Sequence, residues 1–250
     1  MAEPLATGPV DMSTWQQLVH YLNDYYTWNG KNGLPAETLT QLWLTFLSVL
    51  LAAVVALPVG IALGHAKRGG GAVTVVADAT RSVPTYGLLV LLAGITAIGV
   101  GNQAAVIALA VFALAPVLVN AYVGVATVDP DAVDAARGMG MSGGQILRRV
   151  ELPLALPLLA AGIRTAGVQT CATATLAAFV GGGGLGNPIN LGQAQASNGR
   201  GELIGGALAV IVVVIAVEIV LALLQAALTP GTRTRALFLR LRPRREAATA

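Results

Sequence analysis

Long apolar segments alternate with short polar stretches along most of the chain. A helix rises 1.5 Å per residue, so about 20 consecutive apolar residues cross the hydrocarbon core of a bilayer. Five segments reach roughly that length, and they lie at residues 39–63, 72–100, 104–125, 154–180 and 203–228. Within the second segment, we place the membrane portion at about residues 84–98. The pattern predicts an all-α polytopic membrane protein with about five transmembrane helices.

The composition agrees with a membrane protein. Hydrophobic residues make up 55% of the 250 residues and charged residues only 11%, whereas soluble domains carry about 25% charged residues. Six arginines lie between Arg233 and Arg245. Such a basic segment binds nucleic acid in some proteins, but next to a membrane span it is typical of a cytoplasmic segment. We predict a basic cytoplasmic tail at residues 229–250 and no nucleic-acid partner.

The positive charges also predict the orientation in the bilayer, because cytoplasmic loops are enriched in Lys and Arg. With the N-terminus outside and the C-terminus inside, only Lys31 and Arg200 face outward. The loop cations that then face the cytoplasm, together with the tail, are Lys67, Arg68, Arg137, Arg148 and Arg149. The opposite orientation would reverse this asymmetry. Residues 39–228 therefore form the predicted transmembrane domain.

Residues 1–38 form a polar and aromatic segment before the first span. Ser13 and Gln16 have the spacing of a capping box and predict a short helix through about Tyr26. Trp28 belongs to a residue type that gathers at membrane interfaces. We predict an external segment with an interfacial helix. A docking surface for an external partner is the alternative.

The longest polar interval between apolar segments is residues 129–157. Asp129 and Pro130 have the residue types favoured at a helix N-cap and at the first helical position. Gly138 and Gly140 interrupt the alanine-rich segment that follows, because glycine disfavours helix. The interval therefore predicts a short cytoplasmic helix that ends in a glycine turn.

A second short helix follows the turn. Ser142 begins it, with Gln145 placed for a capping box, and Pro153 ends it or begins the next helix. The glycines of residues 138–143 satisfy the G-x-G-x-x-G pattern, but dinucleotide binding requires a strand before that pattern. Here a helix precedes it, so the glycines are predicted to shape the turn.

This interval resembles the cytoplasmic coupling loop of ABC importer permeases. The family's motif is Glu-Ala-Ala, three residues, Gly, nine residues, and Ile-x-Leu-Pro. The matching positions are Asp134, Ala135, Ala136, Gly140, Val150, Leu152 and Pro153. Asp replaces Glu at position 134 and Val replaces Ile at position 150, which keeps charge or shape. Longer stretches are similar to the osmoprotectant (glycine betaine/carnitine/choline) branch, and together the resemblance covers roughly residues 40–228.

The resemblance implies a type I ABC importer permease fold and a set of partners. Its cytoplasmic coupling helices, at residues 129–153, would dock on an ABC ATPase subunit. Asp134 would anchor that contact, or would act as a first-turn charge that stabilises the helix N-terminus. An extracytoplasmic substrate-binding protein and a second permease subunit, in a homodimer or a homologous heterodimer, complete the assembly in the bacterial cytoplasmic membrane.

The chain is not expected to be an enzyme. It has no G-x-x-x-x-G-K-[ST] loop to hold ATP phosphates, no H-E-x-x-H and no G-x-S-x-G. No cofactor is expected in this chain, and ATP and Mg²⁺ are expected in the partner ATPase. His65 has no set of metal ligands near it and is predicted to be a loop residue, while Cys171 is predicted to be inert packing.

The substrate implied by the resemblance is a quaternary ammonium osmoprotectant: glycine betaine, choline or carnitine. A permease for methionine or another amino-acid-like solute is one alternative, and an ATP-independent channel or secondary transporter is another. Aromatic faces usually hold such cations, and spans two to five contain few of them, namely Tyr86, Phe112, Tyr122 and Phe179. Selectivity is therefore expected mostly in the binding protein.

Arg164 and Glu218 are the charges deepest in the predicted spans. At 1.5 Å per residue, they lie at similar depths from the cytoplasmic ends of their spans. Charges within a membrane usually face the bundle interior and mark functional sites, so we predict an ion pair between them. Two separate groups that face water or a second subunit are the alternative. Asp78 and Arg81, three residues apart, are predicted to pair locally.

Glycines carry two further predictions. Gly60 and Gly64 form a small-residue pair in the first span, which permits close helix packing. A glycine-rich segment after the fourth span contains Gly182, Gly183, Gly184 and Gly186. It is either a flexible connector or a re-entrant element at the external mouth of the pathway, where glycine lets the backbone approach a solute. The resemblance favours a place at or near the pathway.

Overall fold

The computed structural model describes residues 12–229, and within that range the regular structure is helical, with no β-strand. The tail predicted at residues 229–250 lies almost wholly outside the described residues. In chain order, the elements are α1 Thr14–Asn23, α2 Tyr25–Trp28, α3 Leu34–His65, α4 Gly70–Ser82, α5 Thr85–Gly94, α6 Asn102–Ala126, α7 Pro130–Gly138, α8 Gly143–Ile146, the π-helix η2 Leu147–Glu151, α9 Leu152–Thr173, the 3-10 helix η3 Ala174–Val180, α10 Gly186–Ala194, the 3-10 helix η4 Ala196–Gly199 and α11 Arg200–Leu228.

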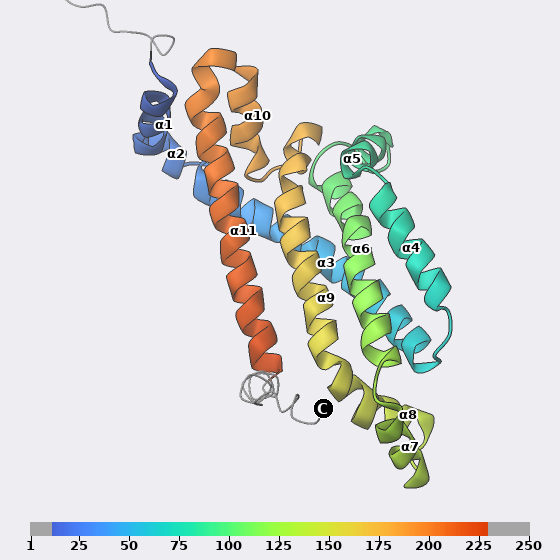
Figure 1. The fold of residues 1–250 in the computed structure, drawn as a ribbon. Coiled ribbons are helices and arrows are strands. Elements are labelled where there is room, and N and C mark those ends of the chain that lie inside the picture. The colour runs from blue at the N-terminus through green and yellow to red at the C-terminus, as the bar shows by residue number, and fades with distance from the viewer. Residues whose placement is uncertain (1–11, 230–250) are drawn as a thin grey trace, which may run out of the picture.

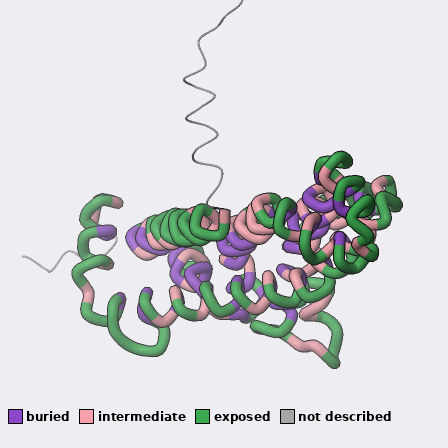
Figure 2. The backbone as a smooth tube through the Cα atoms, turned by 90° about the horizontal axis from the view of Figure 1, so that it is seen from below, coloured by how far each residue is buried: buried purple, intermediate pink, exposed green. Residues whose placement is uncertain are grey.

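Helix α6 lies at the centre of a helix bundle. Figure 1 shows α4, α6, α9 and α11 side by side with α3 crossing behind them. The buried side of α6 is built largely from small residues, and Ala104, Ala108, Ala113 and Ala121 are fully buried. Small side chains let helix backbones approach closely, which is how helices associate in lipid. Exposed positions predominate on the outer faces of the helices (Figure 2).

The small-residue pair in α3 packs against α6, as predicted. A Cβ atom added at Gly60 would lie 2.7 Å from the Ala121 Cβ, and one added at Gly64 would lie 2.7 Å from the Tyr122 carbonyl oxygen. Real Cβ atoms do not approach other atoms this closely. The crossing of α3 and α6 therefore requires glycine at both positions.

Residues 70–94 form two helices with a sharp bend between them. Helices α4 and α5 meet at 77°, because Pro84 disfavours helical backbone at Val83, whose ψ is 121°. Helix α4 lies along α6, and α5 turns away near the start of α6 (Figure 1). Both α4 and α5 contact α6, so the membrane portion predicted at residues 84–98 stays a prediction.

Three helical runs are long and apolar enough to cross a membrane, and the bent α4–α5 pair would make a fourth. The three are α3, α6 and residues 196–228. Helix α9 has 22 residues and lies between α6 and α11 (Figure 1), but Arg164, Thr165 and Gln169 make it more polar. The segment predicted as the fourth span, residues 154–180, changes to the 3-10 helix η3 after α9.

The capping box predicted near the N-terminus is present. The Ser13 N–H donates to Gln16 Oε1 at 2.9 Å, and the Gln16 N–H donates to Ser13 Oγ at 3.3 Å. The helix ends at Asn23, so the prediction that it continues to about Tyr26 is wrong. Asp24 has an extended backbone, and its carboxylate accepts the Tyr26 N–H and starts α2.

Helix α1 packs on the first turns of α11. A Cβ added at Gly201 would lie 2.3 Å from the Gln17 carbonyl oxygen, and one added at Gly205 would lie 2.6 Å from the Tyr21 ring. Burial, and then the negative charge of Glu202, raise the pKa of Tyr21 to about 12. The phenol is therefore neutral at physiological pH, which suits a packed position.

We expect Gly64→Ala to lower the free energy of unfolding by about 1–3 kcal/mol, the usual cost of overpacking a core. The added methyl would meet the Tyr122 carbonyl oxygen and push α3 away from α6. Thermal unfolding in detergent measures the change. Gly71→Ala is the matched control, because no described atom lies within 4 Å of its added methyl. Equal destabilisation by both substitutions would contradict the close crossing.

Candidate functional site

The two short helices predicted around a glycine turn project from one end of the bundle (Figure 1). The Asp129 carboxylate caps α7 by accepting the Asp131 N–H at 3.0 Å. Ser142 and Gln145 form the predicted capping box at α8. Gly140 has a φ of +80°, which glycine adopts without strain. We call residues 129–153 the coupling unit.

A small apolar core holds the coupling unit together. Val128, Val133, Ala136 and Ile146 are buried in it, and Val150 packs against them. Of the two alanines that match the family motif, Ala136 is 1% exposed, whereas Ala135 is exposed on the outer face. The unit therefore rests on a buried apolar base, and its outer surface carries polar side chains together with the exposed Ala135 and Met139.

Asp134 lies on that outer surface. Its side chain is 69% exposed, and its carboxylate accepts a hydrogen bond from Arg137 Nη1 at 2.9 Å. The acidic residue in the first turn of α7 is Asp131, not Asp134. Since the helix dipole acts mainly within the first turn, the helix-stabilising interpretation suits Asp131 better. Asp134 is left available for contact with another protein.

The coupling unit continues into α9 without a break in the helical path. From α8 the chain passes through the π-helix η2 into α9, with Leu152 at its start and Pro153 in its first turn. Because the helical path is continuous, Pro153 removes one backbone N–H that an ordinary helical residue would donate, directly after the π-helical turn. Single π-helical turns are frequent at functional sites. The chain from α8 to α9 is therefore one continuous helical element.

Glu151 in η2 adds a second connection, to α3. It is 2% exposed, and its Oε2 lies 2.5 Å from His65 Nδ1. A buried carboxylate needs such a partner, because an unpaired one is costly to desolvate. The prediction that His65 is a loop residue is wrong. His65 ends α3, and its partner lies 86 residues further along the chain, so no local pattern indicated the contact.

Polar side chains hold the glycine-rich segment at the opposite end of the bundle. Because the sequence predicts an external position for this segment, we call residues 181–187 the external glycine segment. The Gly183 N–H donates to Asn102 Oδ1 at 2.8 Å, and the Gly184 N–H donates to Glu37 Oε2 at 2.6 Å. Asn187 Nδ2 donates to Glu37 Oε1 at 2.9 Å. Glu37 is 4% exposed, so its carboxylate is buried with both oxygens engaged.

Gln41, one turn after Glu37, completes this network. It is fully buried, its Oε1 accepts the Leu185 N–H at 3.2 Å, and its Nε2 donates to the Cys171 carbonyl oxygen at 2.7 Å. The segment also has no spare volume, because a Cβ at Gly186 would lie 1.9 Å from the Thr175 carbonyl oxygen. These contacts argue against a flexible connector, one of the two interpretations left open by the sequence.

Sequence reasoning missed Glu37 and Gln41. Glu37 falls within residues 1–38, the segment predicted to lie outside the membrane domain, but α3 begins at Leu34 and includes it. The two residues are four apart and therefore share one helix face. The available signal was a glutamate at the start of an apolar span, followed four residues later by a glutamine.

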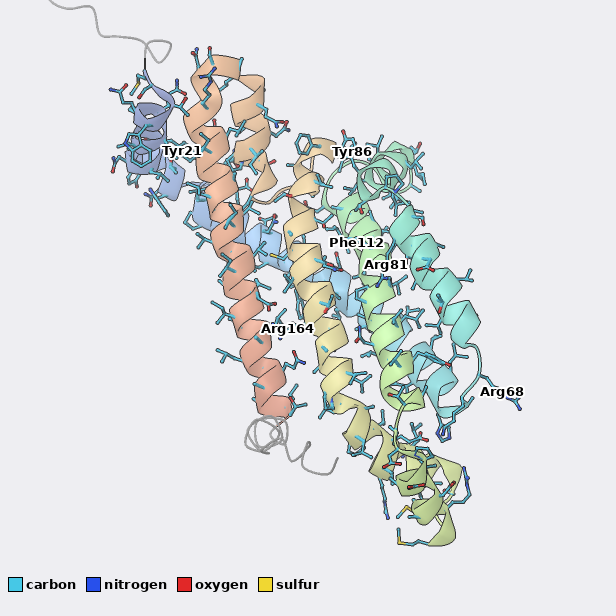
Figure 3. The ribbon with its side chains drawn as sticks, in the orientation of Figure 1. Tyr21, Arg68, Arg81, Tyr86, Phe112 and Arg164 are labelled. Atoms are coloured by element: carbon cyan, nitrogen blue, oxygen red, sulfur yellow. The ribbon has the colours of Figure 1, made fainter. Side chains whose placement is uncertain are left out.

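The ion pair predicted from matched depths is present. Arg164 of α9 points toward α11 (Figure 3), where its Nε donates to Glu218 Oε2 at 3.1 Å and its Nη2 contacts Glu218 Oε1. Arg164 Nη1 also donates to Gln225 Oε1 at 3.1 Å.

The predicted pair of Asp78 and Arg81 is wrong, because the ion pairs of the described chain join other side chains.

These side chains line a groove of about 430 Å³ between α9 and α11. Thr165 and Gln169 of α9 extend its polar lining. The side chains of the ion pair are 36% and 38% exposed, so the groove is open. We call this feature the polar groove.

Comparisons with known proteins agree with this geometry. The sequence model of a family described as "Binding-protein-dependent transport system inner membrane component" matches residues 39–234. The chain is 36% identical to the glycine betaine/carnitine/choline transport system permease protein OpuCB of Bacillus subtilis over 215 residues. This match covers 84% of this chain and 95% of OpuCB. It is 34% identical to the osmoprotectant import permease protein OsmW of Salmonella typhimurium, covering 85% and 97%.

A solved structure has the same arrangement of helices. A chain of the MetNI methionine ABC transporter in an inward-facing conformation matches with a TM-score of 0.67 and 25% sequence identity. The match covers 78% of this chain and 96% of that chain.

We expect Glu37→Ala to free the external glycine segment, because the Gly184 N–H and the Asn187 amide lose their acceptors. An unsatisfied buried polar group costs about 1–3 kcal/mol. Hydrogen exchange at residues 183–187 should become faster, and the free energy of unfolding should fall by about that amount. Glu37→Gln, which keeps one acceptor oxygen, should have a smaller effect. Unchanged exchange in Glu37→Ala would rule out the anchoring role.

Proposed function

Because the chain belongs to the family of binding-protein-dependent transport system inner membrane components, and has the fold of a type I ABC importer permease, we propose that it carries a quaternary ammonium osmoprotectant across the cytoplasmic membrane. Glycine betaine, choline and carnitine are the proposed solutes. The observation that carries this proposal is 36% identity to an osmoprotectant permease along nearly its whole length. The likeness to the methionine transporter, at 25% identity, supports that alternative less.

The coupling unit is the proposed docking surface for an ABC ATPase subunit. Asp134, Ala135 and Gly140 lie on its exposed outer side, while Ala136 fixes α7 to the apolar base. ATP and Mg²⁺ would be held by that partner. Closure of two ATPase subunits would move the coupling units toward each other. The movement would reach α9 through η2 and α3 through the contact between Glu151 and His65.

The distribution of cations supports an orientation with the N-terminus outside. Lys67 and Arg68 follow α3 at the end of the bundle from which the coupling unit projects, as the position of Arg68 in Figure 3 shows. Lys31 and Arg200 lie toward the other end, before α3 and at the start of α11. Since loop cations accumulate on the cytoplasmic side, the coupling unit faces the cytoplasm and the external glycine segment faces out.

A substrate-binding protein would deliver the solute at the external end, and a second permease subunit would complete the pathway. The polar groove supports the presence of the second permease subunit. Charged side chains exposed to lipid are costly, so Arg164 and Glu218 need a pathway or another subunit beside them. Gly182, Gly183, Gly184 and Gly186 lie at the proposed external mouth, where Glu37 and Gln41 fix the backbone.

Uptake of labelled glycine betaine, choline and carnitine tests the proposal. The host should lack its own osmolyte importers and carry this permease with its ATPase and binding protein. We expect uptake of at least one solute, and Asp134→Lys should reduce it by about 10-fold or more, because reversing a charge at a contact repels the partner.

Asp131→Lys is the matched control for this experiment. It reverses a charge in the first turn of the same helix, where the helix dipole acts. A larger loss in Asp131→Lys than in Asp134→Lys would assign the effect to helix stability. Uptake without ATP hydrolysis would indicate a channel or secondary transporter, and ATP hydrolysis with no uptake of the three solutes would overturn the osmolyte assignment.

A further inference from the structure

The Arg164 guanidinium in the polar groove has donors to spare. Arginine carries five N–H donors, and three of them reach Glu218 and Gln225. The two remaining N–H groups have no acceptor among the described residues. The side chain is 36% exposed, so these donors are accessible from the groove. Arginine N–H pairs bind carboxylates strongly because both partners are charged.

The Glu218 carboxylate also keeps unused capacity. Each of its oxygens accepts one hydrogen bond from Arg164, whereas a carboxylate can accept about four. Its side chain is 38% exposed to the same groove. The groove therefore presents a positive and a negative group next to each other, and their net charge is zero.

We propose that this ion pair is a transit site for a zwitterionic solute, with the carboxylate of the solute against the free N–H groups of Arg164 and its quaternary ammonium group beside Glu218. The inference rests on the proposed function. The ion pair and the zwitterionic solute each carry one positive and one negative group. They attract each other when each group lies beside the opposite charge of the other. The groove measures about 430 Å³, within the range of about 300–1,000 Å³ that small-molecule sites occupy.

Further polar groups favour a pathway wall over a lipid-facing surface. Thr165 and Gln169 continue the polar lining along α9, and Gln225 Nε2 donates to the Pro157 carbonyl oxygen at 3.4 Å. A lipid-facing surface at this depth would be apolar, as the exposed leucines and valines of α11 are. The site predicts a difference between solutes, because glycine betaine and carnitine carry a carboxylate and choline does not.

Arg164→Lys tests this difference. Lysine keeps the positive charge opposite Glu218, but it has three donors in place of five and no planar fork. In proteoliposomes that contain the whole transporter and its binding protein, uptake of glycine betaine and carnitine should fall by at least ~10-fold relative to choline, the factor expected for one lost hydrogen bond between charged groups. An equal fall for all three solutes would indicate a structural ion pair and overturn the proposal.

A second measurement does not depend on choline being transported. Saturation-transfer NMR on the detergent-solubilised permease–ATPase complex, without binding protein, compares glycine betaine with its methyl ester. We expect a stronger signal for glycine betaine, and loss of that difference in Arg164→Lys. Equal signals in the unmodified complex would overturn the transit site. Failure of the unmodified transporter to take up any quaternary ammonium solute would instead overturn the proposed function.

Discussion

Polar groups at membrane depth must find partners within the protein, because the hydrocarbon core offers none. Three contacts in the described chain illustrate this constraint. Glu37 and Gln41 hold the non-helical backbone of the external glycine segment. Arg164 and Glu218 neutralise each other between α9 and α11. Glu151 is buried against His65 where the coupling unit meets the bundle. Each of these contacts joins elements that are distant in sequence, so the same bonds that satisfy the polar groups also fix the arrangement of the helices.

The contacts also join the elements into connected parts. The apolar core of the coupling unit and the continuous path from α8 through η2 join this unit to α9. The contact between Glu151 and His65 joins it to α3, and α3 crosses α6 at Gly60 and Gly64 without space for sliding. At the other end, α3 carries Glu37 and holds the external glycine segment. Helix α3 therefore connects the proposed ATPase-facing end of the bundle with its proposed external end.

Sequence patterns predicted what depends on local or periodic signals. The caps at Ser13, Asp129 and Ser142 and the small-residue crossing of α3 follow from residue types at fixed spacing, and all are present. The ion pair of Arg164 and Glu218 could be predicted because intramembrane charges are rare enough to be matched by depth. The bend at Pro84 was missed because residues 72–100 were assigned to one segment, although the largely polar residues 78–82 end just before the proline. Glu37, Gln41 and the partner of His65 were missed because their contacts span 86 residues or more.

The few aromatic residues suit a pathway that holds its solute weakly. Tyr86 and Phe179 meet edge to face, with ring centroids 6.1 Å apart, and neither Phe112 nor Tyr122 joins them within residues 12–229. Two perpendicular rings do not enclose a quaternary ammonium group as a full aromatic cage does. Conduction requires binding that is favourable enough for entry and weak enough for release. A neutral ion pair attracts a zwitterion without the strong field of an isolated charge, so it meets both requirements and leaves tight recognition to the binding protein.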